Sequence, residues 1–331
     1  MSFTRTCCIS GLLLLFLALT CEARVPRNAN VGFIAVNSAH FELNGSPFLF
    51  NGFNSYWLMH VAAEPSERYK VTEGLDFVIS EAKKYDVHLI LSFVNNWNDF
   101  GGKAQYIQWA RNAGAQINGD HDFYTHPILK DYYKNHIKAW VQEMASFVKS
   151  LDNKHLLEVG MEGFYGDLVP ERKQVNPGYQ VGTDFISNHL INEIDFVTIH
   201  AYTDQWVSGQ NDEAQLAWMQ RWVTSDWEDA RTILKKPLVL AEFGKSSRGQ
   251  GYNLSSRDIF MSNVYRNIYN LAKEGGTMAG SLVWQLMAQG MENYDDGYCI
   301  VLGQNPSTAG IISGQSHAMT ALTNLIHNPL E

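Results

Sequence analysis

Glu242 is the residue of this sequence most suited to chemistry, because it stands at the end of an apolar run. The run from Pro237 to Gly244 has the sequence PLVLAEFG, which is typical of a parallel strand buried on both faces. In α/β barrels, catalytic side chains emerge at the carboxyl ends of such strands. A carboxylate buried without a partner costs several kcal/mol. Glu242 is therefore a catalytic candidate, and a structural salt bridge or a cap of the next turn is the alternative.

Five more apolar runs end in polar or aromatic residues, as the strands of an α/β protein do. These predicted strands cover residues 48–56, 87–94, 156–160, 194–199 and 279–283. The residues that follow the last three runs are further candidates for the same site. They are Glu162, the pair His200 and Tyr202, and Trp284.

Amphipathic stretches with helical periodicity separate these runs. They cover residues 73–85, 140–151, 215–234 and 258–273, and a further helical stretch begins at Pro65. Strands that alternate with helices predict βαβ units and a parallel sheet. Because polar residues gather at the ends of many strands, an α/β barrel is favoured over a doubly wound sheet. Asn51 to Asn54 contains a single glycine, which argues against a dinucleotide site.

The first 23 residues have the parts of a secretory signal peptide. Arg5 precedes the apolar residues 11–19, and small residues follow near position 23. The apolar part is too short to span a bilayer, so we expect cleavage near residues 21–23 and a secreted, extracellular protein. Residues 24–331 then form one domain, in which Cys299 is a free thiol. Sequons at Asn44 and Asn253 predict a glycoprotein.

The charge of the chain excludes two classes of partner. The formal net charge is −9 and no basic tract is present, so nucleic acid and anionic membranes are poor partners. The sequence contains no internal repeat or interdomain linker, and we expect a monomer.

Tryptophan is frequent, and several of the nine tryptophans stand near predicted strand ends or in loops. Aromatic rings stack on the flat apolar faces of sugars, while Asn, Gln, His and Glu bind the hydroxyl groups. A carbohydrate is therefore the expected ligand. Trp284 directly follows a buried strand, and we assign it to the site. For Trp109, Trp222 and Trp227, which lie in helical stretches, core packing is the preferred interpretation.

Two other chemistries are less consistent with the residues. Asp120, His121, Asp122 and His126 lie close together, but none of them forms the i, i+4 pair of a His-Glu-x-x-His metal site, and a solvated loop is the better interpretation. A serine hydrolase is disfavoured because no Gly-x-Ser-x-Gly motif follows any strand.

Seven segments of the chain together resemble the plant endo-β-1,4-mannanases, which belong to glycoside hydrolase family 5. They lie at residues 51–59, 89–97, 122–137, 156–166, 199–206, 238–247 and 281–298. The resemblance implies a retaining glycosidase on a (β/α)8 TIM barrel that needs no cofactor or metal. It implies Glu242 as the nucleophile, His200 and Tyr202 as the pair that positions it and the sugar, and Trp284 as the platform under the reacting sugar. Cellulase specificity is a lesser alternative.

The chain also departs from this family. A retaining glycosidase needs a second carboxyl group as acid/base, which in this family is the Glu of an Asn-Glu-Pro motif after strand four. The sequence contains no Asn-Glu-Pro and lacks the Arg-Thr-Trp segment that follows strand two in the family. Compared with the family, two internal portions are missing, at Glu73/Gly74 and Lys138/Ala139. Two in-frame losses suggest skipped exons or an erroneous gene model.

These losses predict an incomplete barrel with six recognisable βα units. Gaps should open beside strands one, three and five, or those strands should pair anew. Three hypotheses for function follow: a mannan endo-hydrolase, a catalytically inactive mannan-binding protein, and an unstable product. Read from the residues alone, Glu162 would be the acid partner of Glu242, but the resemblance gives the matching position no such role and leaves no recognisable acid/base.

Overall fold

The computed structural model describes residues 12–15, 32–56, 77–92, 111, 141–177 and 184–327. Several residues discussed above lie outside these ranges: the helical stretch from Pro65, the loop from Asp120 to His126, and Trp109.

The main sheet has six strands in the order β6-β1-β5-β9-β8-β7. The neighbours β5 and β9, β9 and β8, and β8 and β7 pair in parallel, which confirms the predicted parallel α/β sheet. The bounds of the strands are β1 Leu12–Leu15, β5 Phe50–Asn54, β6 Leu89–Ser92, β7 Val197–Ala201, β8 Leu238–Phe243 and β9 Met278–Val283.

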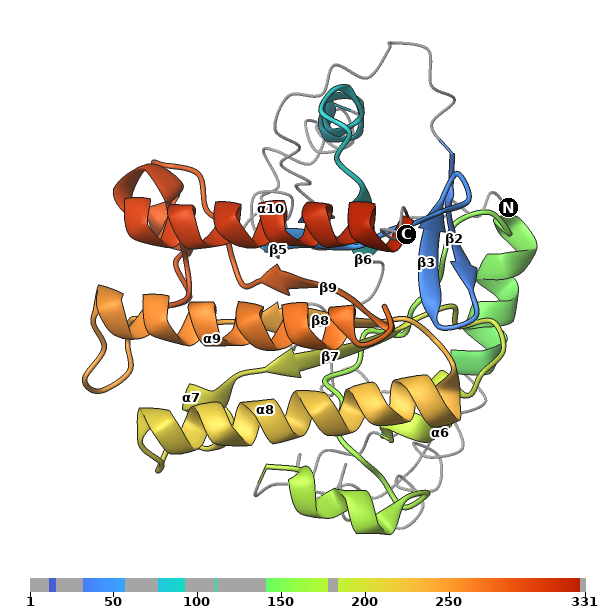
Figure 1. The fold of residues 1–331 in the computed structure, drawn as a ribbon, viewed down its shortest axis with the longest axis horizontal. Coiled ribbons are helices and arrows are strands. Elements are labelled where there is room, and N and C mark those ends of the chain that lie inside the picture. Colours follow the sequence, from blue (N-terminus) through green and yellow to red (C-terminus); the bar gives the residue numbers. More distant parts are fainter. Residues whose placement is uncertain are drawn as a thin grey trace.

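Three long helices run along the parallel strands (Figure 1). They are α8 (Asp212–Asp229, continued by the π-helical turn η3, Ala230–Leu234), α9 (Leu254–Lys273) and α10 (Pro306–His327). Residues 77–84 and 141–151 are also helical, as predicted. The short helices are η2 (Pro170–Val175), α6 (Phe185–His189), α7 (Thr203–Trp206), η4 (Glu292–Tyr294) and η5 (Leu302–Gln304). None of the helices in the described residues is long and apolar enough to cross a lipid bilayer.

The ends of the helices follow local sequence signals. α9 begins with a capping box, in which the Asn253 side chain accepts from the N–H of Ser256 and the Ser256 hydroxyl is bonded in return to the backbone of Asn253. The side chain of Asn211 likewise accepts from the N–H of Ala214 at the start of α8. Such caps satisfy N–H groups that have no partner within the helix.

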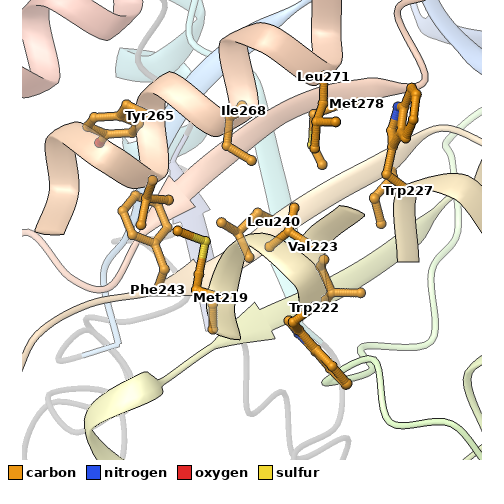
Figure 2. Packing of buried hydrophobic residues seen from close by; sticks show 14 of the residues in the cluster. Met219, Trp222, Val223, Trp227, Leu240, Phe243, Tyr265, Ile268, Leu271 and Met278 are labelled. Atoms are coloured by element: carbon orange, nitrogen blue, oxygen red, sulfur yellow. The ribbon is translucent and has the colours of Figure 1, made fainter. Parts of the chain in front are cut away.

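The parallel strands bury side chains on both faces, because helices pack on one face and a second cluster of buried apolar residues, here called the interior cluster, lies on the other. In β8, Leu238 and Leu240 pack into the cluster formed with α8 and α9, which includes Met219 and Ile268 and is drawn in Figure 2. Val239 and Ala241 belong to the second cluster, on the interior face. Burial on both faces explains the continuous apolar run that marks this strand in the sequence.

A second, three-stranded antiparallel sheet covers the interior cluster. Its strands are β2 (Ile34–Asn37), β3 (His40–Leu43) and β4 (Ser46–Pro47). Phe41 of β3 packs on Phe196, with 5.3 Å between the ring centroids. In Figure 1 this sheet lies at the end of the molecule opposite to α7, so it closes the amino ends of the strands and leaves the carboxyl ends free for a site.

In the described residues, the sheet contains an unexpected strand at the place where the second strand of the barrel is predicted to be missing. Between β5 and β6 lies β1, which pairs antiparallel with both. In the described residues the sheet does not close: β6 and β7 are its two edges. Leu89 and Ile90 of β6 are only partly buried, whereas every residue of β9 is buried. The N-terminal leucines thus occupy the predicted gap, and the cleavage of residues 1–23 stays a prediction.

The predicted strand at residues 156–160 is wrong. These residues form no strand, although they run beside β7, where the Asp195 N–H donates to the Leu157 carbonyl at 2.8 Å. Gly160 has φ +69°, and the Glu158 carboxylate bonds to its N–H. A left-handed residue whose amide is bonded to a side chain interrupts a regular ladder. β7 itself ends two residues later than predicted.

Candidate functional site

Glu242 lies at the carboxyl end of β8, where the strand contains one extra residue. From Leu240 to Phe243, β8 advances three residues, while β9 advances two, from Ser281 to Val283. The register with β7 shifts at the same place. Leu240 and Phe243 both pack on the helix side, so the alternation of side chains breaks between them. This β-bulge lets Glu242 leave the helix side, a common use of bulges beside active sites.

The side chain of Glu242 contacts both residues that the resemblance pairs with it. The Tyr202 hydroxyl donates to Glu242 Oε2 at 2.7 Å. Nδ1 of His200, the residue opposite Glu242 in the β7–β8 register, lies 3.6 Å from the same oxygen. The His200 and Glu242 side chains are only 15% and 18% exposed. The structure therefore brings together three of the predicted site residues in a largely dry place.

Burial controls the charge of these groups. It lowers the pKa of His200 to about 3, so the ring is neutral near neutral pH and forms no ion pair with Glu242. Burial raises the pKa of Glu242 to about 8, and the charges of Glu162 and Asp296 add to this rise, whereas the hydrogen bond from Tyr202 opposes it. The pKa of Tyr202 lies well above its usual value because of burial and the Glu242 charge. Tyr202 therefore keeps its proton and donates a hydrogen bond to Glu242.

Trp284 follows β9 directly and stands beside Glu242's strand. Its N–H donates to the Phe243 carbonyl at 2.9 Å, and its indole Nε1 donates to Asp296 Oδ2 at 2.6 Å. The ring of Tyr56, at the end of β5, lies 5.3 Å from the Trp284 ring. Trp284 is only partly buried, so the structure agrees with a tryptophan that offers part of its ring to a ligand.

Tyr298 supports Tyr202 from the side. The two rings meet edge to face at 5.3 Å, and the Tyr298 hydroxyl donates to Asp204 at 3.1 Å and accepts from Gln205 at 2.7 Å. A Cβ atom at Gly244 would lie 2.7 Å from the Tyr298 ring and 2.8 Å from the Trp284 carbonyl. Only glycine therefore allows the chain after Glu242 to pass between them.

Glu162 lies next to this group, in the segment that runs beside β7. Its carbonyl accepts from the His200 N–H at 3.0 Å. Burial raises the pKa of its carboxyl, and its charge acts on Glu242. Glu158 serves a different purpose, because its carboxylate accepts from Thr198 at 2.9 Å and lies 3.2 Å from buried His189. Glu162 is thus the carboxyl of this segment that faces the site.

Three residues of the site were missed by the sequence reasoning. Asn54 is fully buried, and its Nδ2 donates to the Ala241 carbonyl in the bulge at 2.9 Å. Asp296 and Tyr298 come from the loop after β9. The only signal in the sequence was the presence of these residues within segments that resemble the family.

Two further observations concern residues considered for other roles. Trp222 and Trp227 are 0% and 4% exposed, which confirms core packing for both. The ligand atoms of Asp295, Asp296 and Cys299 lie within 4.8 Å of one another, a grouping that could hold a metal ion. Asp296 already accepts hydrogen bonds from Trp284 and Gln285, so its carboxylate is used by the aromatic platform.

Comparison with known proteins gives one family. A family model described as "GH family 5 beta-mannosidase-like" matches residues 67–137 and 125–296. The mannan endo-1,4-beta-mannosidase 1 of Solanum lycopersicum is 64% identical over 407 residues, with 99% of this chain and 100% of the relative covered. The mannan endo-1,4-beta-mannosidase 7 of Arabidopsis thaliana is 38% identical, with 89% and 87% covered.

The length of the first alignment bears on the predicted losses. It extends over 407 positions, whereas this chain has 331 residues, so the relative contains residues with no counterpart here. Among solved structures, a glycoside hydrolase family 5 mannosidase from Rhizomucor miehei has a TM-score of 0.64 and 16% identity, covering 90% of this chain and 100% of that one. At this identity the likeness concerns the fold, which is that of the (β/α)8 barrel.

Proposed function

Because the chain belongs to the glycoside hydrolase family 5 mannosidases, we propose that it hydrolyses internal β-1,4-mannosidic linkages of mannan, galactomannan or glucomannan. The contact between Tyr202 and Glu242 is the observation that carries the proposal. A carboxyl group at the end of a barrel strand, bonded to a phenol at 2.7 Å, is suited to nucleophilic attack on a sugar.

In the proposed reaction, Glu242 attacks the anomeric carbon and forms a glycosyl ester. The bond to the leaving oxygen breaks with both electrons on that oxygen, which takes a proton from water because no acid/base residue is recognisable in the sequence. A second water then hydrolyses the ester and releases Glu242 as a carboxylate. Tyr202 donates a hydrogen bond that favours the ionised form of Glu242. Neutral His200 lies 3.6 Å from the same oxygen and positions the carboxyl group, and Trp284 supports the apolar face of the sugar.

The proposed reaction is limited because no proton donor for the leaving oxygen is recognisable in the sequence. The sequence contains no Asn-Glu-Pro motif, and general acid assistance is worth about 10²- to 10⁴-fold in rate. We therefore propose that turnover of unactivated mannan is lower than in a complete family member by at least about three orders of magnitude. Aryl mannosides, whose leaving groups need little protonation, should show a smaller deficit.

A mannan-binding protein without turnover is the second candidate. It is favoured because Trp284, Tyr202 and His200 are present around Glu242 while the acid/base motif is absent from the sequence. The partly buried β6 and the open edges of the sheet in the described residues support a third outcome, which is a chain of low stability.

The cellular setting is part of the proposal. We infer that residues 1–23 are removed as a signal peptide, and that residues 24–331 act as a secreted monomer in the plant cell wall. Mannan-type polysaccharide would be its partner there, and the exposed sequons at Asn44 and Asn253 would carry glycans.

The test compares two substrates with one control. Purified residues 24–331 are assayed for reducing ends on galactomannan and for phenol release from an aryl β-mannoside, beside Glu242→Gln, whose amide cannot form the ester. Weak galactomannan hydrolysis and stronger aryl release, both lost in Glu242→Gln, are expected. Ordinary mannanase rates would refute the assigned role of the missing motif, and hydrolysis that survives Glu242→Gln would refute the nucleophile.

Binding and folding separate the other candidates. Retention on insoluble mannan without turnover would identify the binding protein. A melting scan without a cooperative transition would identify the unstable product. Sequencing the transcript across Glu73/Gly74 and Lys138/Ala139 would show whether the chain is made in this form.

A further inference from the structure

Asp296, which no sequence pattern selected, makes a set of contacts centred on Trp284. Its Oδ2 accepts from Trp284 Nε1 at 2.6 Å and from Gln285 Nε2 at 3.2 Å. The other end of the Gln285 amide accepts from the Tyr56 N–H at 2.8 Å. One carboxylate therefore connects the platform tryptophan, the residue after it and the end of β5.

The loop that carries Asp296 is itself well anchored. Asp296 Oδ1 accepts from the Tyr298 N–H at 3.0 Å. The next residue, Gly297, has φ +100°, and its carbonyl accepts from the Ser247 N–H at 2.6 Å. The Ile300 N–H donates to the Gln285 carbonyl at 2.9 Å. Because the loop is bound to β9's extension and to the segment after β8, the carboxylate is a fixed acceptor.

A fixed acceptor at the indole N–H determines how the ring lies. Trp284 is partly buried, so packing alone leaves the ring some freedom to rotate about its side-chain bonds. A short hydrogen bond to an ionised carboxylate is stronger than one between neutral groups. It holds one edge of the indole, while the Tyr56 ring contacts it at 5.3 Å.

We propose that Asp296 is a positioning residue that sets the orientation of the Trp284 ring, and thereby the surface on which a mannosyl unit stacks. This inference rests on the proposed function. It assigns to the loop after β9 a part in sugar binding without contact to the sugar.

The charge of Asp296 provides a second, separate effect that can be measured. Asp296 acts on Glu242 as a like charge and helps to raise its pKa. Replacement by asparagine keeps an oxygen that accepts the indole N–H and removes the charge, while its amide nitrogen then faces the Tyr298 N–H and loses that one bond. Replacement by alanine removes both. The two variants therefore separate the orientation of Trp284 from the electrostatic effect.

The experiment compares Asp296→Ala and Asp296→Asn with Asp295→Asn. Asp295 lies in the same loop and bonds to the Gly297 N–H at 2.9 Å, so its variant makes the same charge change without touching Trp284. Chains labelled with ¹⁵N-tryptophan report the hydrogen exchange of the Trp284 indole, assigned with Trp284→Phe. Calorimetry gives the affinity for mannohexaose.

In Asp296→Ala, exchange at the Trp284 indole should be faster by about tenfold or more, and the affinity weaker by about tenfold. Asp296→Asn should keep both within about threefold, and it should shift the ionisation of Glu242 to lower pH. Asp295→Asn should change neither. An unchanged indole exchange rate in Asp296→Ala overturns the inference.

Failure of the proposed function gives a different pattern. If mannohexaose binds equally well to the unmodified chain and to Trp284→Ala, or to neither, the proposed sugar site is wrong, and with it the stacking surface assigned here. Binding that depends on Trp284 but is unchanged in Asp296→Ala overturns the positioning role alone.

Discussion

Replacing Tyr202 by phenylalanine should make Glu242 harder to ionise. The hydroxyl donates to Glu242 Oε2 at 2.7 Å, and it opposes the burial that raises the pKa of this carboxyl to about 8. A hydrogen bond to a charged group contributes about 1.5–3 kcal/mol. Since one pKa unit corresponds to about 1.4 kcal/mol, the variant should ionise about 1–2 pH units higher.

Covalent labelling of the nucleophile measures this shift. A 2-deoxy-2-fluoromannosyl fluoride has a leaving group that needs little protonation, so its reaction with Glu242 reports ionisation without an acid catalyst. The labelling rate, followed by intact mass, should rise about tenfold per pH unit and level off near the ionisation pH of Glu242. At pH 7 the Tyr202→Phe rate should be lower by about 10- to 100-fold.

Tyr298→Phe is the matched control for this experiment. It removes the same atom from a neighbouring ring, but the Tyr298 hydroxyl bonds to Asp204 and Gln205 and not to Glu242. Its labelling profile should change much less. A midpoint in Tyr202→Phe that is unchanged or lower than in the unmodified chain would refute the assignment of Tyr202 as the group that favours the ionised carboxylate.

Three further changes test other parts of the structure. Glu162→Gln removes a like charge near Glu242, so the labelling midpoint should fall while labelling persists; lost labelling would contradict this. Asn54→Ala removes the side-chain donor to the Ala241 carbonyl and should slow labelling at all pH values. Asn51→Ala is the control, because it loses contacts to α10 instead. It should lower the melting temperature as much as Asn54→Ala does, but leave the labelling rate unchanged. Asp226 is fully buried, and burial holds its pKa well above 3.8, while the neighbouring Tyr165 opposes this rise. Its stabilising effect is therefore present at low pH and lost as pH rises through the folded-state pKa. The melting temperature of Asp226→Asn should equal that of the unmodified chain near pH 4 and exceed it by a growing margin at higher pH. A difference in melting temperature that does not change with pH would refute this.

Local patterns made much of the fold predictable. Strands β8 and β9 are buried on both faces, so nearly every residue in them is apolar, and the runs at 237–244 and 279–283 marked them within one or two residues. Helices α8 and α9 followed from their periodicity. The segment at 156–160 failed because it is apolar like a strand, while the left-handed Gly160 and the Glu158 contact to its amide depend on the folded backbone.

The central residues of the candidate site were predictable, but its supporting residues and its geometry were not. Glu242, His200, Tyr202 and Trp284 were selected as strand-end residues, and the structure places Tyr202 and His200 at Glu242. The supporting groups are not visible in any local pattern. Asn54 acts on a carbonyl that is 187 residues away in the sequence, and the Tyr298 hydroxyl reaches a residue 94 positions earlier.

The sequence by itself determined most of the long helices and parallel strands and where the carboxyl ends of these strands carry polar groups, and it predicts that two portions of the family's barrel are missing. These properties depend on neighbouring residues and on the order of the segments. Only the tertiary structure decided that β8 contains an extra residue before Phe243, that β1 lies between β5 and β6, and that Asp296 accepts from Trp284. Such features arise from the register and curvature of the sheet, which bring distant backbone and side-chain atoms within hydrogen-bond distance.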